Sequence, residues 1–142
     1  GNNVCNSFVS ASIILGFKLK VATPTGYEPA EDYLRRAKSV TVTNEPVEAA
    51  ANADVIYTDV WASMGQESEA AQRKKIFSRF QVNADLLKNA NRDHIVMHCL
   101  PAHRGEEITD DVIDGPHSIV YDEAENRLHV QKGIMVWLSQ KI

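Results

Sequence analysis

Two short runs of the sequence combine chemically active side chains. HCLP, residues 98–101, sets His98 beside Cys99, one of two cysteines in the chain. A cysteine thiol becomes an effective base or nucleophile when a nearby cation lowers its pKa below the usual value of about 8.5. The other run, DVWASMGQE at residues 59–67, contains a carboxylate, a hydroxyl and a thioether. Together the two runs supply a carboxylate, a hydroxyl, a thiol and an imidazole.

Both runs follow segments that are typical of β-strands. Such segments recur along the chain and alternate with stretches whose apolar residues have helical spacing. The predicted strands are KLKVAT at 18–23, SVTVT at 39–43, DVIYT at 54–58, HIVMH at 94–98 and SIVY at 118–121. Strands that alternate with helices pair in parallel, because each crossover returns the chain to the same end. The pattern predicts an α/β, doubly wound, Rossmann-like fold: an open parallel sheet with helices on both faces.

The chain opens on GNNVCNS, which is typical of a turn and helix start after a strand. Gly1, Asn2 and Asn3 offer turn and N-cap chemistry to a predicted helix over residues 3–16. We therefore expect the first strand of the fold to be missing from this sequence and to lie upstream in the parent protein.

Open parallel sheets bind ligands outside the carboxyl ends of their strands. At this edge we expect the chain opening and the loops after residues 58 and 98. The candidate site residues on them are Asn3, Asp59, Ser63, Met64, His98, Cys99 and Leu100. Taken singly, each has an ordinary structural explanation: Asp59 as a turn residue, Cys99 as a small buried side chain and Arg127 as a solvated cation. Only their combination points to a function.

Composition argues against several classes of protein. Fifteen basic and nineteen acidic residues give a net charge of -4, without the basic cluster of a nucleic-acid binder. No apolar run approaches the roughly 20 residues that span a bilayer. No GxGxxG run follows a strand, so a nucleotide cofactor is not expected. A disulfide between Cys5 and Cys99 is not expected, because a domain of this size with a good core does not need one. A metal is not expected either, because Cys5, His98, Cys99 and His103 are poorly spaced for tetrahedral zinc.

Three motifs together carry a family resemblance. DVWASMGQE, HCLPAHRGEEI and EAENR resemble the ornithine carbamoyltransferase family, and the resemblance covers residues 1–142 as its carboxy-terminal, ornithine-binding domain. It implies carbamoyl transfer from carbamoyl phosphate to the side-chain amine of L-ornithine, giving L-citrulline and phosphate in arginine metabolism. It also implies a cytoplasmic homotrimer that needs no cofactor.

The resemblance assigns roles to the candidate residues. Ornithine would be held by Asn3, Asp59, Ser63 and Met64, with residues 62–67 as a lid. Carbamoyl phosphate would contact Cys99, Leu100 and Arg127. Cys99 would accept the proton of the reacting amine, with its pKa lowered by Arg127, or would orient the amine as a neutral thiol. His98 would help to orient the carbamoyl oxygen.

The sequence departs from the family in one respect and leaves alternatives open. The family's serine-threonine-arginine-threonine-arginine run, which binds phosphate, does not occur in it. We therefore expect the amino-terminal carbamoyl-phosphate domain to be absent from this sequence and the chain alone to be inactive. The alternatives are a non-catalytic ornithine-binding or regulatory module and a carbamoyltransferase for putrescine.

Overall fold

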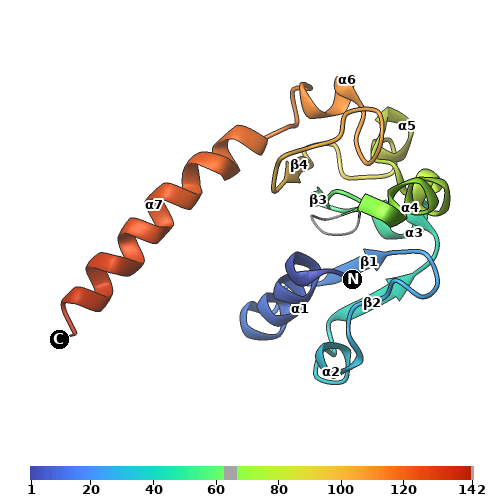
Figure 1. The fold of residues 1–142 in the computed structure, drawn as a ribbon. Coiled ribbons are helices and arrows are strands. Elements are labelled where there is room, and N and C mark those ends of the chain that lie inside the picture. The colour runs from blue at the N-terminus through green and yellow to red at the C-terminus, as the bar shows by residue number, and fades with distance from the viewer. Residues whose placement is uncertain (63–66, 142) are drawn as a thin grey trace.

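Parallel strand pairs organise the chain in the computed structural model, which describes residues 1–62 and 67–141 (Figure 1). Strand β1 (Leu19–Ala22) pairs with β2 (Val40–Thr43), and β3 (Val55–Thr58) pairs with β4 (Ile95–His98). The α/β class with parallel strands flanked by helices agrees with the sequence prediction. Within the described ranges the strands form two separate pairs rather than one continuous ladder.

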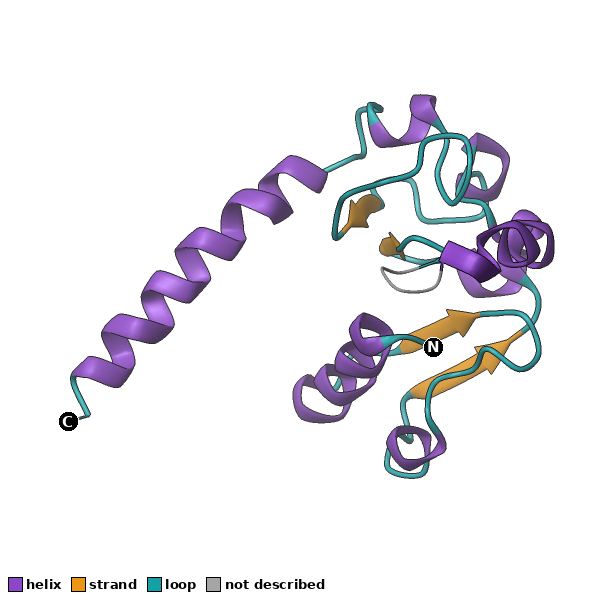
Figure 2. Ribbon diagram, in the orientation of Figure 1, coloured by secondary structure: helices purple, strands orange, loops and turns teal. Residues whose placement is uncertain are grey.

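Most of the helices are short, and the first and the last are the longer ones (Figure 2). Their bounds are α1 Asn3–Leu15, α2 Glu31–Leu34, α3 Pro46–Ala50, η1 Glu67–Glu69, α4 Ala70–Phe77, η2 Ser78–Phe80, α5 Ala84–Leu87, α6 Asp110–Ile113 and α7 Val120–Ser139.

Capping residues explain the bounds of α1. The side chain of Asn2 accepts a hydrogen bond from the N–H of Cys5 at 2.9 Å, which satisfies one donor of the first turn. The helix ends at Gly16, whose φ of 78° lies in the left-handed region that glycine adopts without steric cost. The helix predicted over 3–16 is therefore confirmed to within one residue.

The strand predicted at 118–121 is reduced to a single parallel bridge between Val96 and Ser118. Val96 donates to the carbonyl of His117 at 2.8 Å and accepts from Ile119 at 3.0 Å. Helix α7 then begins at Val120. Asp122 and Glu123 in its first turn favour a helix start, because negative charge there complements the helix dipole.

The core surrounds the β3–β4 pair. Its buried members are Ala50, Ile56, Val82, Val96, Ile108, Val112, Ile113 and Val120. These side chains come from both strands, from α3, α6 and α7, and from the loops that follow η2 and β4. The packing therefore fixes the ends of β3 and β4, from which the candidate loops start.

Helix α7 extends away from the rest of the chain (Figure 1). Its base contacts β4, whereas its outer part leaves several large apolar side chains exposed: Leu128, Val130, Ile134, Met135, Val136, Trp137 and Leu138. Among the described residues, no helix is both long and apolar enough to cross a membrane.

Candidate active site

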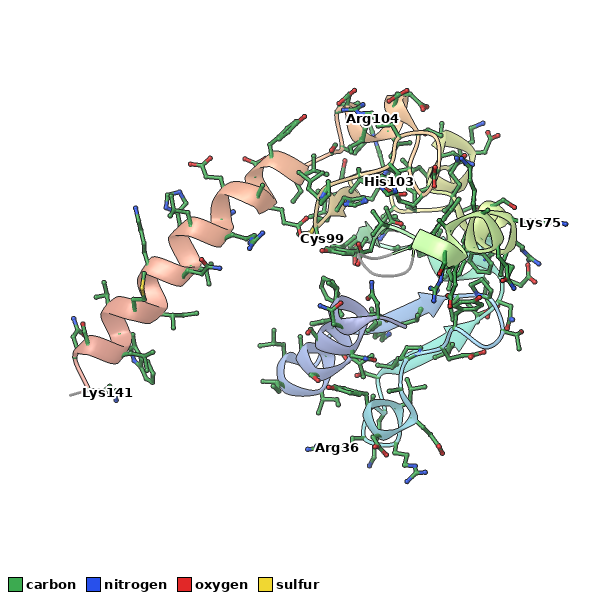
Figure 3. The ribbon with its side chains drawn as sticks, in the orientation of Figure 1. Arg36, Lys75, Cys99, His103, Arg104 and Lys141 are labelled. Carbon is green, nitrogen blue, oxygen red and sulfur yellow. The ribbon has the colours of Figure 1, made fainter. Side chains whose placement is uncertain are left out.

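Asp59 and Cys99 meet at the carboxyl ends of β3 and β4. In the parallel register Thr58 lies opposite His98, so the next residue of each strand emerges at the same edge. Sγ of Cys99 lies 3.1 Å from Oδ1 of Asp59 and donates to it. The N–H of Val60 also donates to this oxygen at 2.8 Å. Figure 3 labels Cys99 where β4 ends.

Asn2 completes this cluster from the start of α1. Its Nδ2 donates to Oδ2 of Asp59 at 2.5 Å, while its Oδ1 caps the helix. Asn3, which the family resemblance predicted to bind ornithine, is exposed. Its backbone carbonyl accepts a hydrogen bond from Oγ of Ser7. The structure thus brings Asn2 to Asp59, and the role of Asn3 stays a prediction. The signal for Asn2 was its N-cap position, which directs the side chain back across the helix start.

The thiol of Cys99 is held in its neutral form. Burial raises its pKa to about 11, and the hydrogen bond to Asp59 and the negative charge of that carboxylate act in the same direction. This is opposite to the lowered pKa expected from a neighbouring Arg127. Arg127 lies on an exposed turn of α7, four residues beyond Glu123. The neutral-thiol alternative fits this geometry better than a resting thiolate.

His98 is turned into the protein. Its Nε2 lies 3.0 Å from Oε1 of Glu107, and its Nδ1 accepts from the N–H of Leu100 at 2.9 Å. His98 is 1% exposed and Glu107 is 0% exposed. Both ring nitrogens are therefore engaged within the chain, which leaves neither for the carbamoyl oxygen that the sequence assigned to His98. Glu107 was not singled out from the sequence.

Glu123 ties the base of α7 to both strands of the site. Its carboxylate accepts from the hydroxyl of Tyr57 at 3.0 Å and from the N–H of His98 at 3.1 Å. Burial raises the pKa of Tyr57, as do the neighbouring Cys99 and Glu123, so its hydroxyl stays protonated as a donor. A residue of β3 and a residue of β4 are thus held by one carboxylate.

Other predicted features of the site differ in what can be described. Ser63, Met64 and the central part of the predicted lid lie outside the described residues. Leu100 adopts a left-handed φ of 49° and precedes a cis peptide bond to Pro101.

Cys5 and Cys99 are free thiols. Within residues 1–62 and 67–141, no group of three or more His, Cys, Asp and Glu side chains is arranged to hold a metal ion.

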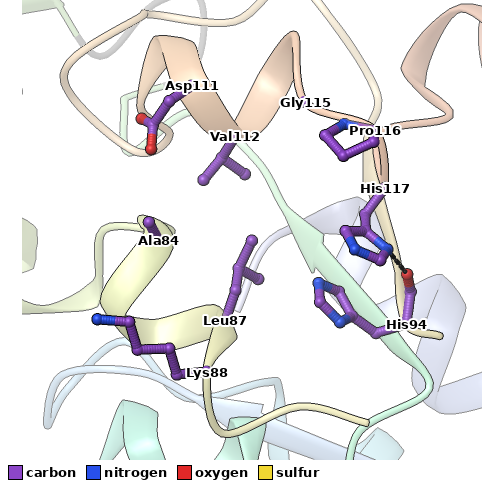
Figure 4. A pocket seen from close by; sticks show the side chains of 9 residues that line it. All are labelled: Ala84, Leu87, Lys88, His94, Asp111, Val112, Gly115, Pro116 and His117. Carbon is purple, nitrogen blue, oxygen red and sulfur yellow. Dashed lines mark hydrogen bonds between the residues drawn. The ribbon is translucent and has the colours of Figure 1, made fainter. Parts of the chain in front are cut away.

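A pocket of about 270 Å³ lies elsewhere, beside α5 and α6 (Figure 4). His94 and His117 form one wall, and their rings stack with centroids 4.3 Å apart. His94 directly precedes β4, whereas Cys99 follows it. The pocket therefore lies at the opposite end of the strand from the cluster of Asn2, Asp59 and Cys99.

Comparison with known proteins supports the motif resemblance. Residues 1–138 match the family model described as "Aspartate/ornithine carbamoyltransferase, Asp/Orn binding domain". The chain belongs to the aspartate/ornithine carbamoyltransferase family. An ornithine carbamoyltransferase from Pyrococcus horikoshii is 57% identical over 146 residues, covering 97% of this chain and 46% of that protein.

Solved structures of ornithine carbamoyltransferases share the fold. The enzyme from Pyrococcus furiosus superposes with a TM-score of 0.89 at 57% identity, covering 95% of this chain and 46% of that chain. The anabolic enzyme from Campylobacter jejuni gives a TM-score of 0.91 at 32% identity, covering 97% and 48%. The predicted family and fold class are confirmed. The chain spans about half the length of these carbamoyltransferases.

Proposed function

We propose that this chain is the ornithine-binding side of an ornithine carbamoyltransferase, which transfers the carbamoyl group of carbamoyl phosphate to the side-chain amine of L-ornithine. The observation that carries the proposal is the contact between Asp59 and Cys99, with Asn2 on the second carboxylate oxygen. The products are L-citrulline and phosphate. The enzyme serves arginine metabolism.

The carboxylate suits the α-ammonium group of an amino-acid substrate. Asp59 ends a strand, so its backbone is fixed, and both of its oxygens already accept hydrogen bonds. An ammonium group is a cationic donor that a carboxylate binds more strongly than it binds a neutral thiol. Ornithine would therefore displace Sγ of Cys99 from Asp59. Ser63 and Met64 would complete the ornithine pocket, with Asn3 beside them.

Release from Asp59 would prepare Cys99 for proton transfer. The hydrogen bond to Asp59 and its charge are two of the causes that raise the thiol pKa to about 11. Neutralising that charge with the substrate ammonium lowers the pKa toward that of the reacting amine, about 10. The thiol would first give its own proton to solvent, and the thiolate would then take one proton from the side-chain ammonium of ornithine, whose similar pKa keeps the energetic cost of the transfer low. No bond between sulfur and substrate is needed.

The carbamoyl phosphate side requires residues outside this chain. Cys99, Leu100 and Arg127 are proposed to contact carbamoyl phosphate, and Arg127 would stabilise the negative charge that develops on it. The remaining phosphate contacts belong to an amino-terminal domain of the parent protein, which we propose to act as a cytoplasmic homotrimer. The chain alone is expected to make no citrulline.

The exposed face of α7 supports this two-part arrangement. Soluble domains seldom expose so many large apolar side chains on one helix, among them Ile134, Trp137 and Leu138. The relatives are about twice as long as this chain. We assign this face to packing against the other half of the same protein.

A parallel amine assay tests the proposed function. The full-length protein is supplied with carbamoyl phosphate and with ornithine, putrescine, aspartate or lysine, and carbamoylated product is measured. Turnover with ornithine alone is expected, reduced at least about 100-fold by Asp59→Asn and by Cys99→Ala. Equal turnover with putrescine would overturn the assigned role of Asp59, because putrescine has no α-ammonium group. Ornithine binding without turnover would instead support a non-catalytic module.

A further inference from the structure

The tautomer of His98 is fixed by its two neighbours. A backbone N–H can only donate, so Nδ1 of His98, which receives the N–H of Leu100 at 2.9 Å, must carry a lone pair. The proton of the neutral ring is then on Nε2, where it points to Oε1 of Glu107 at 3.0 Å. A carboxylate accepts and does not donate, which matches this tautomer. The ring therefore links a buried carboxylate to the backbone of Leu100.

Glu107 remains charged in this buried place. Burial by itself raises the pKa of a carboxyl group, but the hydrogen bonds from His98 and from the N–H of His103 outweigh it and lower the pKa below the usual value. The His103 contact measures 2.6 Å to the same oxygen, Oε1. One carboxylate oxygen thus ties together the end of β4 and the loop that returns to Glu107.

The position of Leu100 requires such support. Its φ of 49° is in the left-handed region, which is sterically unfavourable for a residue with a β-carbon. This conformation turns the chain directly after Cys99, beside the thiol, and affects the direction of the Leu100 carbonyl. The hydrogen bond from Leu100 N–H to His98 closes that turn.

We propose that Glu107 is a positioning residue, which acts through His98 to hold the Cys99–Leu100 turn in the geometry that meets the substrates. The proposal rests on the proposed carbamoyltransferase function. Glu107 touches neither substrate: it fixes the His98 tautomer, and the tautomer fixes the Leu100 backbone. Glutamine at position 107 has an NH2 donor beside its one accepting oxygen; with the NH2 facing Nε2, His98 would have to carry its proton on Nδ1, opposite the Leu100 N–H, and two donors would then face each other.

Steady-state kinetics of the full-length protein test the proposal. Glu107→Gln is compared with Glu106→Gln, a matched control in which the neighbouring carboxylate, paired with Lys74 on the surface, loses the same charge. We expect Glu107→Gln to lower kcat at least about tenfold while KM for ornithine changes less than about threefold, because the bound amine is held by Asp59 but the turn is misplaced. Glu106→Gln is expected to keep both constants. An unchanged kcat in folded Glu107→Gln would overturn the proposal.

A second measurement separates this proposal from the function on which it depends. Nitrogen-15 NMR of His98 in the wild-type protein reports which ring nitrogen is protonated, and amide hydrogen exchange reports the protection of Leu100 N–H. We expect the Nε2–H form and a protected amide, with Leu100 protection lost in Glu107→Gln and kept in Glu106→Gln. An Nδ1–H form, or an unprotected Leu100 amide, would refute the link even if the enzyme is active. If the protein carbamoylates no amine, the proposed function is wrong. The expected NMR result would still support the link from Glu107 through His98 to the Leu100 backbone.

Discussion

The thiol of Cys99 donates to the carboxylate of Asp59 across 3.1 Å, although the two residues are forty positions apart in the sequence. The parallel register of β3 and β4 creates this contact, because Thr58 and His98 are partners and both strands end there, so that Asp59 and Cys99 follow at the same edge. The same oxygen that a substrate ammonium would need is occupied by the thiol. Binding of the amino acid and the protonation of Cys99 are consequently coupled at one atom.

The substitution Asp59→Asn should make Cys99 more reactive. With a pKa of about 11 the wild-type thiol is ionised to only about one part in a thousand at pH 8. Removing the negative charge lowers that pKa, so alkylation by iodoacetamide should speed up and its pH profile should shift to lower pH. The adduct on each cysteine is quantified by mass spectrometry. Cys5, whose pKa is also raised by burial, serves as the internal control, and an unshifted profile for Cys99 would contradict the coupling.

Substitutions of Asn2 and Asn3, the two asparagines at the start of α1, should have different effects on stability and on ornithine binding. Asn2→Ala removes the helix cap, at a cost of about 1 kcal/mol in unfolding free energy, and also removes a donor to Asp59. Asn3→Ala leaves the cap in place and should leave the unfolding free energy unchanged. Urea denaturation measures both. If Asn3 binds ornithine as predicted, Asn3→Ala will raise KM for ornithine without a loss of stability; an unchanged KM would remove it from the site.

Loss of the Tyr57 hydroxyl should loosen the base of α7. Tyr57→Phe deletes the donor at 3.0 Å from Glu123 but keeps the ring, so a loss of about 1 kcal/mol in unfolding free energy is expected. Tyr33→Phe is the matched control, because Tyr33 is 41% exposed and lies on α2. Equal stability of the two variants would show that the Glu123 contact contributes little.

The contribution of the buried Glu107 carboxylate to the unfolding free energy should depend on pH. Its pKa is lowered from the usual value of 4.5 in the folded protein, so it contributes stability above that pH. The contribution is lost as the pH falls through the folded pKa, where the carboxylate takes up a proton. The difference in unfolding free energy between wild type and Glu107→Gln should therefore shrink below about pH 4.5. Glu106→Gln should show no such convergence; a pH-independent difference for Glu107→Gln would argue against a charged Glu107.

The sequence predicted the framework of the fold because local signals coincide there with tertiary structure. Gly16 ends α1, and β3 and β4 have the β-branched residues and the following polar loops of parallel strands. The predicted strand at 118–121 failed because the acidic residues that follow it start a helix before a ladder can extend. Residues 118–123 therefore contain signals for a strand and signals for the start of a helix.

The sequence predicted that Asp59 and Cys99 lie at one edge of the sheet, and the structure brings them into contact, because the edge of a parallel sheet brings the ends of neighbouring strands together. The substrate roles assigned to the site residues stay predictions. Glu107 was missed because a glutamate in a charged loop is usually exposed, and only the fold shows that it meets His98. Asn2 was assigned to the cap rather than to the site because sequence reasoning gives one side chain one role, whereas its amide has an oxygen and a nitrogen that serve separately.

The length of α7 has a mechanical consequence for the site. Its twenty residues make a rod about 30 Å long, and Glu123 near its base is hydrogen-bonded to the strands that carry Asp59 and Cys99. A tilt of about 5° at the base moves the far end by roughly 2.6 Å for a rod of this length. A displacement of the far end of the helix by a few ångströms therefore corresponds to a small change in the angle of its base. Where its tip is seated fixes the angle at which Glu123 meets Tyr57 and His98.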